Sequence, residues 1–71
     1  MNPETIREIL RKQPFEPFEV HLTNGETHSV RHPEQVALGK ARMVIIYPES
    51  DRIVICSLLH VASVEMLQSA A

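Results

Sequence analysis

Four histidines and one cysteine are the side chains of this sequence that could build a metal or catalytic site. They are His21, His28, His32, His60 and Cys56. His28 and His32 lie four residues apart, so in an extended chain they share one side but stand ~13 Å apart at ~3.3 Å per residue. One metal ion could bind both only if the chain bends at Pro33, and Glu34 or His60 would then complete a zinc-type set. The wide spacing favours polar edge residues, and we predict no metal and no cofactor.

Cys56 and His60 could act as a nucleophile and its base. Cys56 closes a β-branched run, however, where a buried small apolar residue is the expected role. The sequence has no Gly-rich phosphate loop, no Ser-centred elbow and no paired catalytic carboxylates, since Glu16 and Glu19 follow an exposed pattern. We therefore predict that the protein is not an enzyme and that it has no catalytic residues.

Three basic residues around the middle of the chain, Arg31, Lys40 and Arg42, could contact nucleic acid together with the turn at Asn24. Phosphate neutralisation supplies most of the affinity of a nucleic-acid binder, which usually carries a strong basic excess. The formal net charge here is −2, and Glu34 lies among the basic residues. The pattern favours a solvated surface over an RNA site.

Size and composition indicate one folded domain over residues 1–71, with a core built from Ile, Val and Leu. The single cysteine excludes an intramolecular disulfide and suits a reducing compartment. The N-terminus lacks the basic and apolar regions of a signal peptide. The longest apolar run, residues 43–47, is far shorter than the ~20 residues that span a bilayer. These features predict a cytoplasmic protein that does not enter membranes.

The clearest structural signal is a β-hairpin in residues 18–30. Phe18, Val20 and Leu22 alternate with polar residues, and Asn24-Gly25 supplies a turn that tolerates positive φ. A two-residue loop would place Val30 on the polar face. A three-residue loop with a bulge at the glycine pairs Val20 with His28 and Phe18 with Val30, which restores one apolar face. We predict the bulged loop, with strands over about 18–23 and 26–32.

A helix is expected over residues 3–13, before the hairpin. Asn2 is a good N-cap, Pro3 suits the first helical position, and Pro14 ends the helix. Ile6, Ile9 and Leu10 form one apolar stripe. So short a helix is not stable alone, and we expect its stripe to dock on the apolar face of the hairpin.

Three more strands are predicted over residues 42–47, 52–57 and 61–66. The first two contain the continuous apolar runs 43–47 and 53–56, which indicate strands covered on both faces. Ser57 caps a short helical turn before the last strand, although one helix over 57–67 is the alternative. Residues 36–38 are either an added strand or a turn, and residues 68–71 are expected to be a frayed tail.

This order, a helix followed by five short antiparallel strands with a helical turn before the last, resembles an SH3-like small barrel. It is more narrowly similar to the Sm-like fold, on the glycine turn at residues 21–25 and the strand, turn and strand at residues 53–64. The resemblance implies edge-strand oligomerisation and RNA binding. The chain departs from that family, because it lacks the Asp-centred motif after the second strand, the Arg-Gly pair at the closing turn and a basic tail.

A second resemblance spans nearly the whole chain. The sequence is similar to a family of small uncharacterised bacterial proteins with a Pro-Phe-x-Pro-Phe-x-x-His-Leu-x-x-Gly start, a central His-Pro-Glu and a later Ser-Leu-Leu-His. These motifs are residues 14–25, 32–34 and 57–60 here. This resemblance implies no activity.

Together, these observations predict a mainly β (α+β) protein with a five-stranded antiparallel barrel. We expect a non-enzymatic module that forms a homo-oligomer through edge strands or binds a protein partner. The alternative is an Sm-like RNA-binding protein, with contacts from Asn24, Arg31, Lys40 and Arg42.

Overall fold

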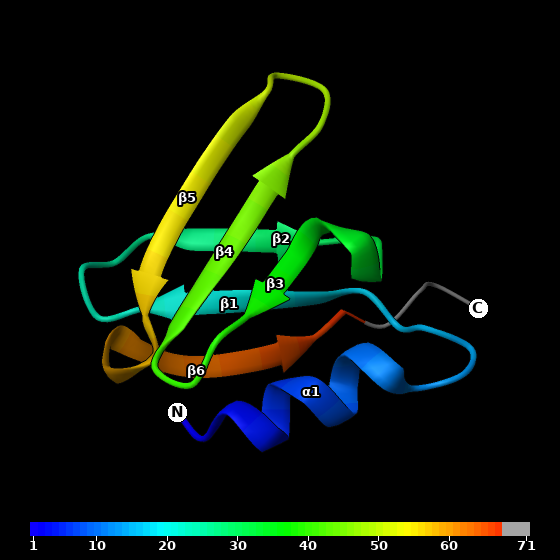
Figure 1. Ribbon diagram of the computed structural model, residues 1–71, viewed down its shortest axis with the longest axis horizontal. Helices are drawn as coiled ribbons and strands as arrows, with labels where there is room; N and C mark the ends of the chain where they lie inside the picture. The colour runs from blue at the N-terminus through cyan, green and yellow to red at the C-terminus, as the bar shows by residue number, and fades with distance from the viewer. Residues whose placement is uncertain (68–71) are drawn as a thin grey trace.

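Six strands form two three-stranded antiparallel sheets in the computed structural model, which describes residues 1–67 (Figure 1). The first sheet has the order β2–β1–β6 and consists of β1 (Phe18–Leu22), β2 (Thr27–Val30) and β6 (Val61–Met66). The second has the order β3–β4–β5 and consists of β3 (Val36–Leu38), β4 (Arg42–Tyr47) and β5 (Arg52–Ser57). The remaining elements are helix α1 (Pro3–Arg11) and the 3₁₀ turns η1 (Pro33–Gln35) and η2 (Leu58–His60).

The β1–β2 hairpin has the predicted bulged register. Val20 pairs with His28, and Phe18 pairs with Val30. The Gly25 N–H donates to the Leu22 carbonyl at 3.0 Å, and Gly25 has a φ of 90°. Glycine reaches this left-handed region without the clash that a Cβ would cause, so the turn closes with a bulge and keeps one face apolar.

Helix α1 begins as predicted, with the Asn2 side chain accepting from the Glu4 N–H at 2.9 Å. It ends at Arg11, two residues before the predicted end. The helix lies beside β6, and its Ile6 is fully buried in the core that Phe18 and Val20 also form (Figure 1). The described residues contain no helix of the length and apolar character that a bilayer crossing needs.

The core lies between the two sheets. It contains nine buried apolar side chains: Ile6, Phe18, Val20, Leu22, Val30, Met43, Ile45, Leu58 and Val61. Two polar side chains, His28 and Gln35, are buried with them. Apart from Phe18, these core side chains are Ile, Val, Leu and Met, and in β1 and β4 they alternate inward along the strand.

The predicted mainly β architecture with an N-terminal helix is confirmed, but the five-stranded barrel is not found. Residues 36–38, left open between strand and turn, form β3 as a sixth strand paired with β4. Pro33 cannot donate to a ladder, and the chain turns through η1 there, so β2 ends at Val30 instead of continuing to residue 32. Within residues 1–67 no pairing joins the two sheets, and the sheets therefore stay open.

The segment after β5 forms a turn and a strand, as predicted, instead of one helix. The Ser57 side chain accepts from the Leu59 N–H at 3.2 Å and caps η2. β6 then pairs antiparallel with β1 along its length. The tail expected at residues 68–71 lies outside the described residues.

Candidate interaction surface

The second sheet has an apolar face that the rest of the described chain leaves uncovered. Five residues alternate toward this side, which we call the outer face: Ala37, Val44, Ile46, Ile53 and Ile55. The register aligns Ala37, Val44 and Ile55 across the three strands, and Ile46 pairs with Ile53. On the opposite side Met43 and Ile45 are fully buried. The predicted strands covered on both faces are thus covered on one face only.

The large apolar side chains of the outer face are most exposed on β5. Val44 and Ile46, on the central strand, are half-buried. Ile53 and Ile55 are 59% and 68% exposed, although they are large and apolar. The difference in exposure follows from position, because β5 is an edge strand whose only strand neighbour in the described part of the chain is β4.

The backbone of β5 also has no strand partner along this edge among residues 1–67. The Leu58 N–H donates to the Ala41 carbonyl at 2.8 Å, which continues the β4–β5 register. Hydrogen-bonded pairs alternate in an antiparallel ladder. Cys56 and Val54 therefore bond to β4, whereas Ile53, Ile55 and Ser57 direct their N–H and C=O groups away from the sheet.

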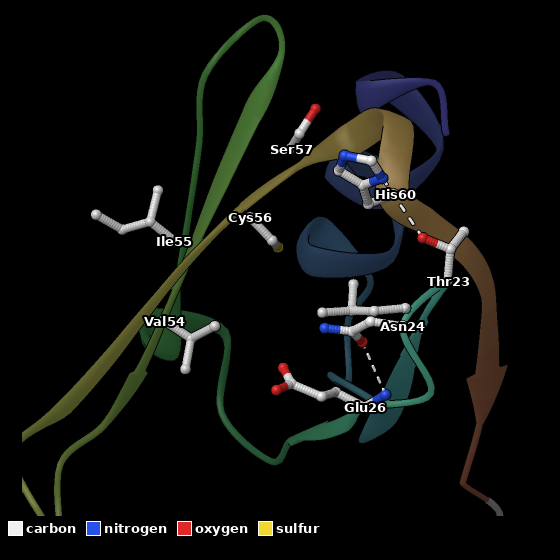
Figure 2. A pocket seen from close by; sticks show the side chains of 9 residues that line it. Thr23, Asn24, Glu26, Val54, Ile55, Cys56, Ser57 and His60 are labelled. Atoms are coloured by element: carbon white, nitrogen blue, oxygen red, sulfur yellow. Dashed lines mark hydrogen bonds between the residues drawn. The ribbon is translucent and has the colours of Figure 1, made fainter.

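A groove of about 430 Å³ follows the free edge of β5 (Figure 2). One wall is β5 from Val54 to Ser57, and the other is the β1–β2 turn with Glu26. Val54 and Cys56 point toward the turn, while Ile55 points away from it (Figure 2). We call this hollow the edge groove.

Cys56 and His60, considered above as a nucleophile and base, both line the edge groove. Burial raises the pKa of the Cys56 thiol, and the Glu26 carboxylate raises it further. A raised pKa disfavours the thiolate, which is the reactive form. His60 Nδ1 lies 3.4 Å from Thr23 Oγ1, and the Cys56 thiol lies 3.7 Å from the Met43 carbonyl. These contacts favour a packing role for Cys56 and His60 over a catalytic one.

His28 takes part in a part-buried hydrogen-bond chain between the two sheets. Its side chain is 3% exposed. Nδ1 lies 2.6 Å from the Tyr47 hydroxyl, and Nε2 lies 3.2 Å from the Glu26 carboxylate. The expectation that His28 faces the core beside Val20 is confirmed. Its Tyr47 partner was missed, although a core-facing histidine must find a polar partner and so signals that one exists.

Gln35 is a second buried polar group that the sequence reasoning missed. Its Oε1 accepts from the Arg31 and His32 N–H groups at 2.8 and 3.0 Å, and its Nε2 donates to the Ile46 carbonyl at 3.0 Å. One side chain thus satisfies the backbone at the end of β2 and attaches that strand to β4. A glutamine between a proline turn and an apolar strand carries no sequence signal for this role.

The residues suggested for nucleic-acid contact lie in three places. Asn24 is in the turn before β2, where its Oδ1 accepts from the Glu26 N–H at 2.9 Å. Arg31 follows β2 at its other end and lines a separate hollow with His32 and Tyr47. Lys40 and Arg42 lie exposed at the β3–β4 turn. RNA binding through these residues stays a prediction.

Among the described residues, one group of metal-ligating types comes together, and it differs from the set considered above. Glu19, His21 and Glu65 place their ligand atoms within 4.8 Å of one another on β1 and β6. His21 Nε2 lies 3.5 Å from Glu19 and 4.0 Å from Glu65, distances that an ion pair with a protonated imidazole also gives. His32 and Glu34 lie 4.0 Å apart on the exposed surface.

Comparison with protein-family models, with curated proteins and with solved structures finds no match for this chain. The resemblances to the small bacterial family and to Sm-like proteins therefore stay predictions. Function has to be argued from the geometry of the chain itself.

Proposed function

We propose that this chain is a non-enzymatic interaction module that self-associates through the second sheet. One observation carries the proposal: the unpaired backbone edge of β5 coincides with the most exposed aliphatic side chains of the outer face. At Ile53 and Ile55, unpaired N–H and C=O groups stand beside large apolar side chains that are 59% and 68% exposed. Such an edge is a template for pairing with another strand.

The apolar surface supplies the driving force for this association. Transfer of apolar surface out of water stabilises a complex by about 25 cal/mol per Å². Monomeric proteins rarely leave a contiguous apolar face uncovered, and one that is uncovered marks an interaction site. One charged residue, Arg42, shares this side of β4, and it lies opposite Ser57 at the end of the face, beyond Val44 and Ile55. Burial of this face against a partner is therefore more favourable than its exposure to solvent.

The non-enzymatic part of the proposal is supported by the edge groove. Its one thiol has a pKa raised by burial, so at neutral pH it is held as the unreactive thiol. Its one histidine contacts a threonine hydroxyl. The groove adjoins an open strand edge, which is the arrangement that strand-binding proteins use.

The test is multi-angle light scattering of the full chain from low micromolar to millimolar concentration. We expect a concentration-dependent dimer or larger oligomer, and we expect Ile55→Lys to shift the protein to monomer because a charge at an edge opposes strand pairing. Leu59→Lys is the matched control, because Leu59 is 85% exposed but lies on η2 outside the outer face. It should leave the oligomer unchanged.

A wild-type chain that stays monomeric over the whole range would contradict self-association. Nucleic acid that accompanies the purified chain and is released by salt would instead favour the RNA-binding alternative. Circular dichroism of each variant confirms that the fold is retained before the masses are compared.

A further inference from the structure

Four strands have an edge without a strand partner among the described residues: β2, β3, β5 and β6. Natural sheets protect such edges by short length, by charge or by proline. β3 has three residues, β2 lies between Glu26 and Arg31, and β6 carries the exposed Glu65. β5 has six residues, and its one charge, Arg52, is at its first position. β5 is therefore the unprotected edge.

The hydrogen-bonding groups of this edge are self-complementary. Ile53, Ile55 and Ser57 present outward N–H and C=O groups, spaced by two residues. In an antiparallel pair of two β5 strands, an axis at Ile55 places Ile55 opposite its own copy and Ile53 opposite Ser57. Every outward residue of both strands then has a partner.

Neighbouring registers satisfy fewer of these groups. An axis at Val54 places Ser57 opposite Asp51, which has a φ of 57° in the β4–β5 turn. An axis at Cys56 places Ile53 opposite Leu59, whose N–H already donates to the Ser57 hydroxyl within η2. The axis at Ile55 is the one that confines the pairing to β5 itself.

Side chains on both sides of the strand fit the same arrangement. On the outer face Ile55 meets its copy, so the most exposed aliphatic residue of β5 becomes buried. On the inner side Val54 meets Cys56 of the second copy, and both already point into the edge groove (Figure 2). No charged side chain lies within residues 53–57, so none of the paired residues carries a charge.

We infer that β5 pairs antiparallel with β5 of a second copy, around a two-fold axis at Ile55. The inference rests on the proposed function and names its partner strand and register. A strand partner satisfies both the unpaired backbone and the apolar side chains of β5, whereas a partner packed flat on the outer face would cover the side chains alone. The second sheets of the two copies then form one continuous six-stranded sheet.

Disulfide trapping tests the register. Each variant carries Cys56→Ala, so that the introduced cysteine is the only one, and is oxidised at micromolar concentration. Ile55→Cys should crosslink, because residues opposite each other in a hydrogen-bonded pair have Cα atoms about 5.5 Å apart, within disulfide reach. Ile53→Cys should not, since its copy lies about 13 Å further along the strand at ~3.3 Å per residue.

The crosslinking rate gives the size of the expected effect. A paired position has an effective concentration near millimolar, so Ile55→Cys should crosslink about a hundred times faster than a chance encounter at ~10 µM. Leu59→Cys, at a position that is also highly exposed but lies outside β5, supplies the chance rate. A mixture of Ile53→Cys and Ser57→Cys chains should form the mixed dimer, although neither chain crosslinks with itself. This mixed-chain experiment tests the same register with Ile55 left in place.

The outcomes separate the two proposals. Rapid trapping of Ile53→Cys with itself, or of no β5 position in a chain that light scattering shows to be dimeric, overturns the two-fold pairing and leaves self-association standing. A chain that is monomeric by light scattering, with every variant trapped at the Leu59→Cys rate, overturns both.

Discussion

At the scale of single residues, the most demanding environment is that of His28. An ionised carboxylate can only accept, so the contact with Glu26 assigns the proton of a neutral ring to Nε2, and Nδ1 then accepts from the Tyr47 hydroxyl. Tyr47 also lies under the Arg52 guanidinium, 5.3 Å from the ring centre. The chain of contacts joins the first sheet to the second through side chains alone.

Replacing Tyr47 with Phe removes the hydroxyl and leaves the buried Nδ1 of His28 without a partner. We expect the free energy of unfolding to fall by about 1–3 kcal/mol at neutral pH, the usual cost of an unsatisfied buried polar group. Urea unfolding followed by circular dichroism measures it. His32→Ala, which removes an exposed histidine, should change stability by less than about 0.5 kcal/mol.

The stabilities of the wild type and of Tyr47→Phe should also depend differently on pH in alkaline solution. Burial raises the pKa of Tyr47, Arg52 lowers it and Glu26 raises it, with a net upward shift from 10.0. A raised pKa in the folded state contributes stability below pH 10 that is lost as pH rises through the folded pKa. Wild-type stability should therefore decline above about pH 10 more steeply than that of Tyr47→Phe. Cys56→Ala is placed in both chains, because the raised thiol pKa acts in the same direction from about pH 9.

At the scale of elements, the β1–β2 turn is set by the backbone of one glycine. A Cβ on Gly25 would meet nothing within 4 Å, so any cost of a side chain there comes from its φ of 90° alone. The Asn24 side chain supports the turn through its bond to the Glu26 N–H. Local chemistry therefore accounts for the whole element.

Gly25→Ala should lower the free energy of unfolding by about 1–2 kcal/mol, the cost of a left-handed conformation for a residue with a Cβ. Gly39→Ala is the matched control. A Cβ at Gly39 would meet the Arg42 carbonyl at 3.6 Å, an ordinary contact, and its φ is not in the left-handed region. Equal losses in the two variants, measured by thermal unfolding, would contradict a conformational origin.

At the scale of the whole molecule, two open sheets are held together by the apolar core and by two buried polar side chains, His28 and Gln35. Gln35 bonds to the backbone of Arg31, His32 and Ile46. It thereby links the end of β2 to the second sheet, to which no strand pairing joins it within residues 1–67.

Gln35→Ala should be among the most destabilising single changes in the chain, because three part-buried backbone hydrogen bonds are lost at once. We expect a loss of more than about 2 kcal/mol in the free energy of unfolding, measured by urea titration. Glu34→Ala changes the adjacent residue, whose side chain is 79% exposed, and should have little effect. A loss in Gln35→Ala no larger than in Glu34→Ala would show that the bonds do not support the fold.

The outer face is the feature of the whole molecule that bears on function. The two apolar runs that contribute most of it could be recognised in the sequence. Residues 43–47 and 53–56 are apolar at both alternating positions, which predicts a sheet with two apolar faces. Within the described chain only the inner face is covered, by Phe18, Val20 and the rest of the core. The apolar residues of the uncovered outer face are consistent with a partner.

The sequence by itself determined the features that arise between neighbouring residues: the Asn2 cap, the bulged turn at Gly25, the register of β1 on β2, and the Ser57 turn before the last strand. Each follows from local backbone and side-chain chemistry. Only the tertiary structure decided that six strands form two open sheets, that β5 is left at an edge beside a groove, and that Tyr47 and Gln35 are the polar links. Those outcomes depend on which segments far apart in the sequence come into contact. Such long-range contacts are determined by the packing of the whole core.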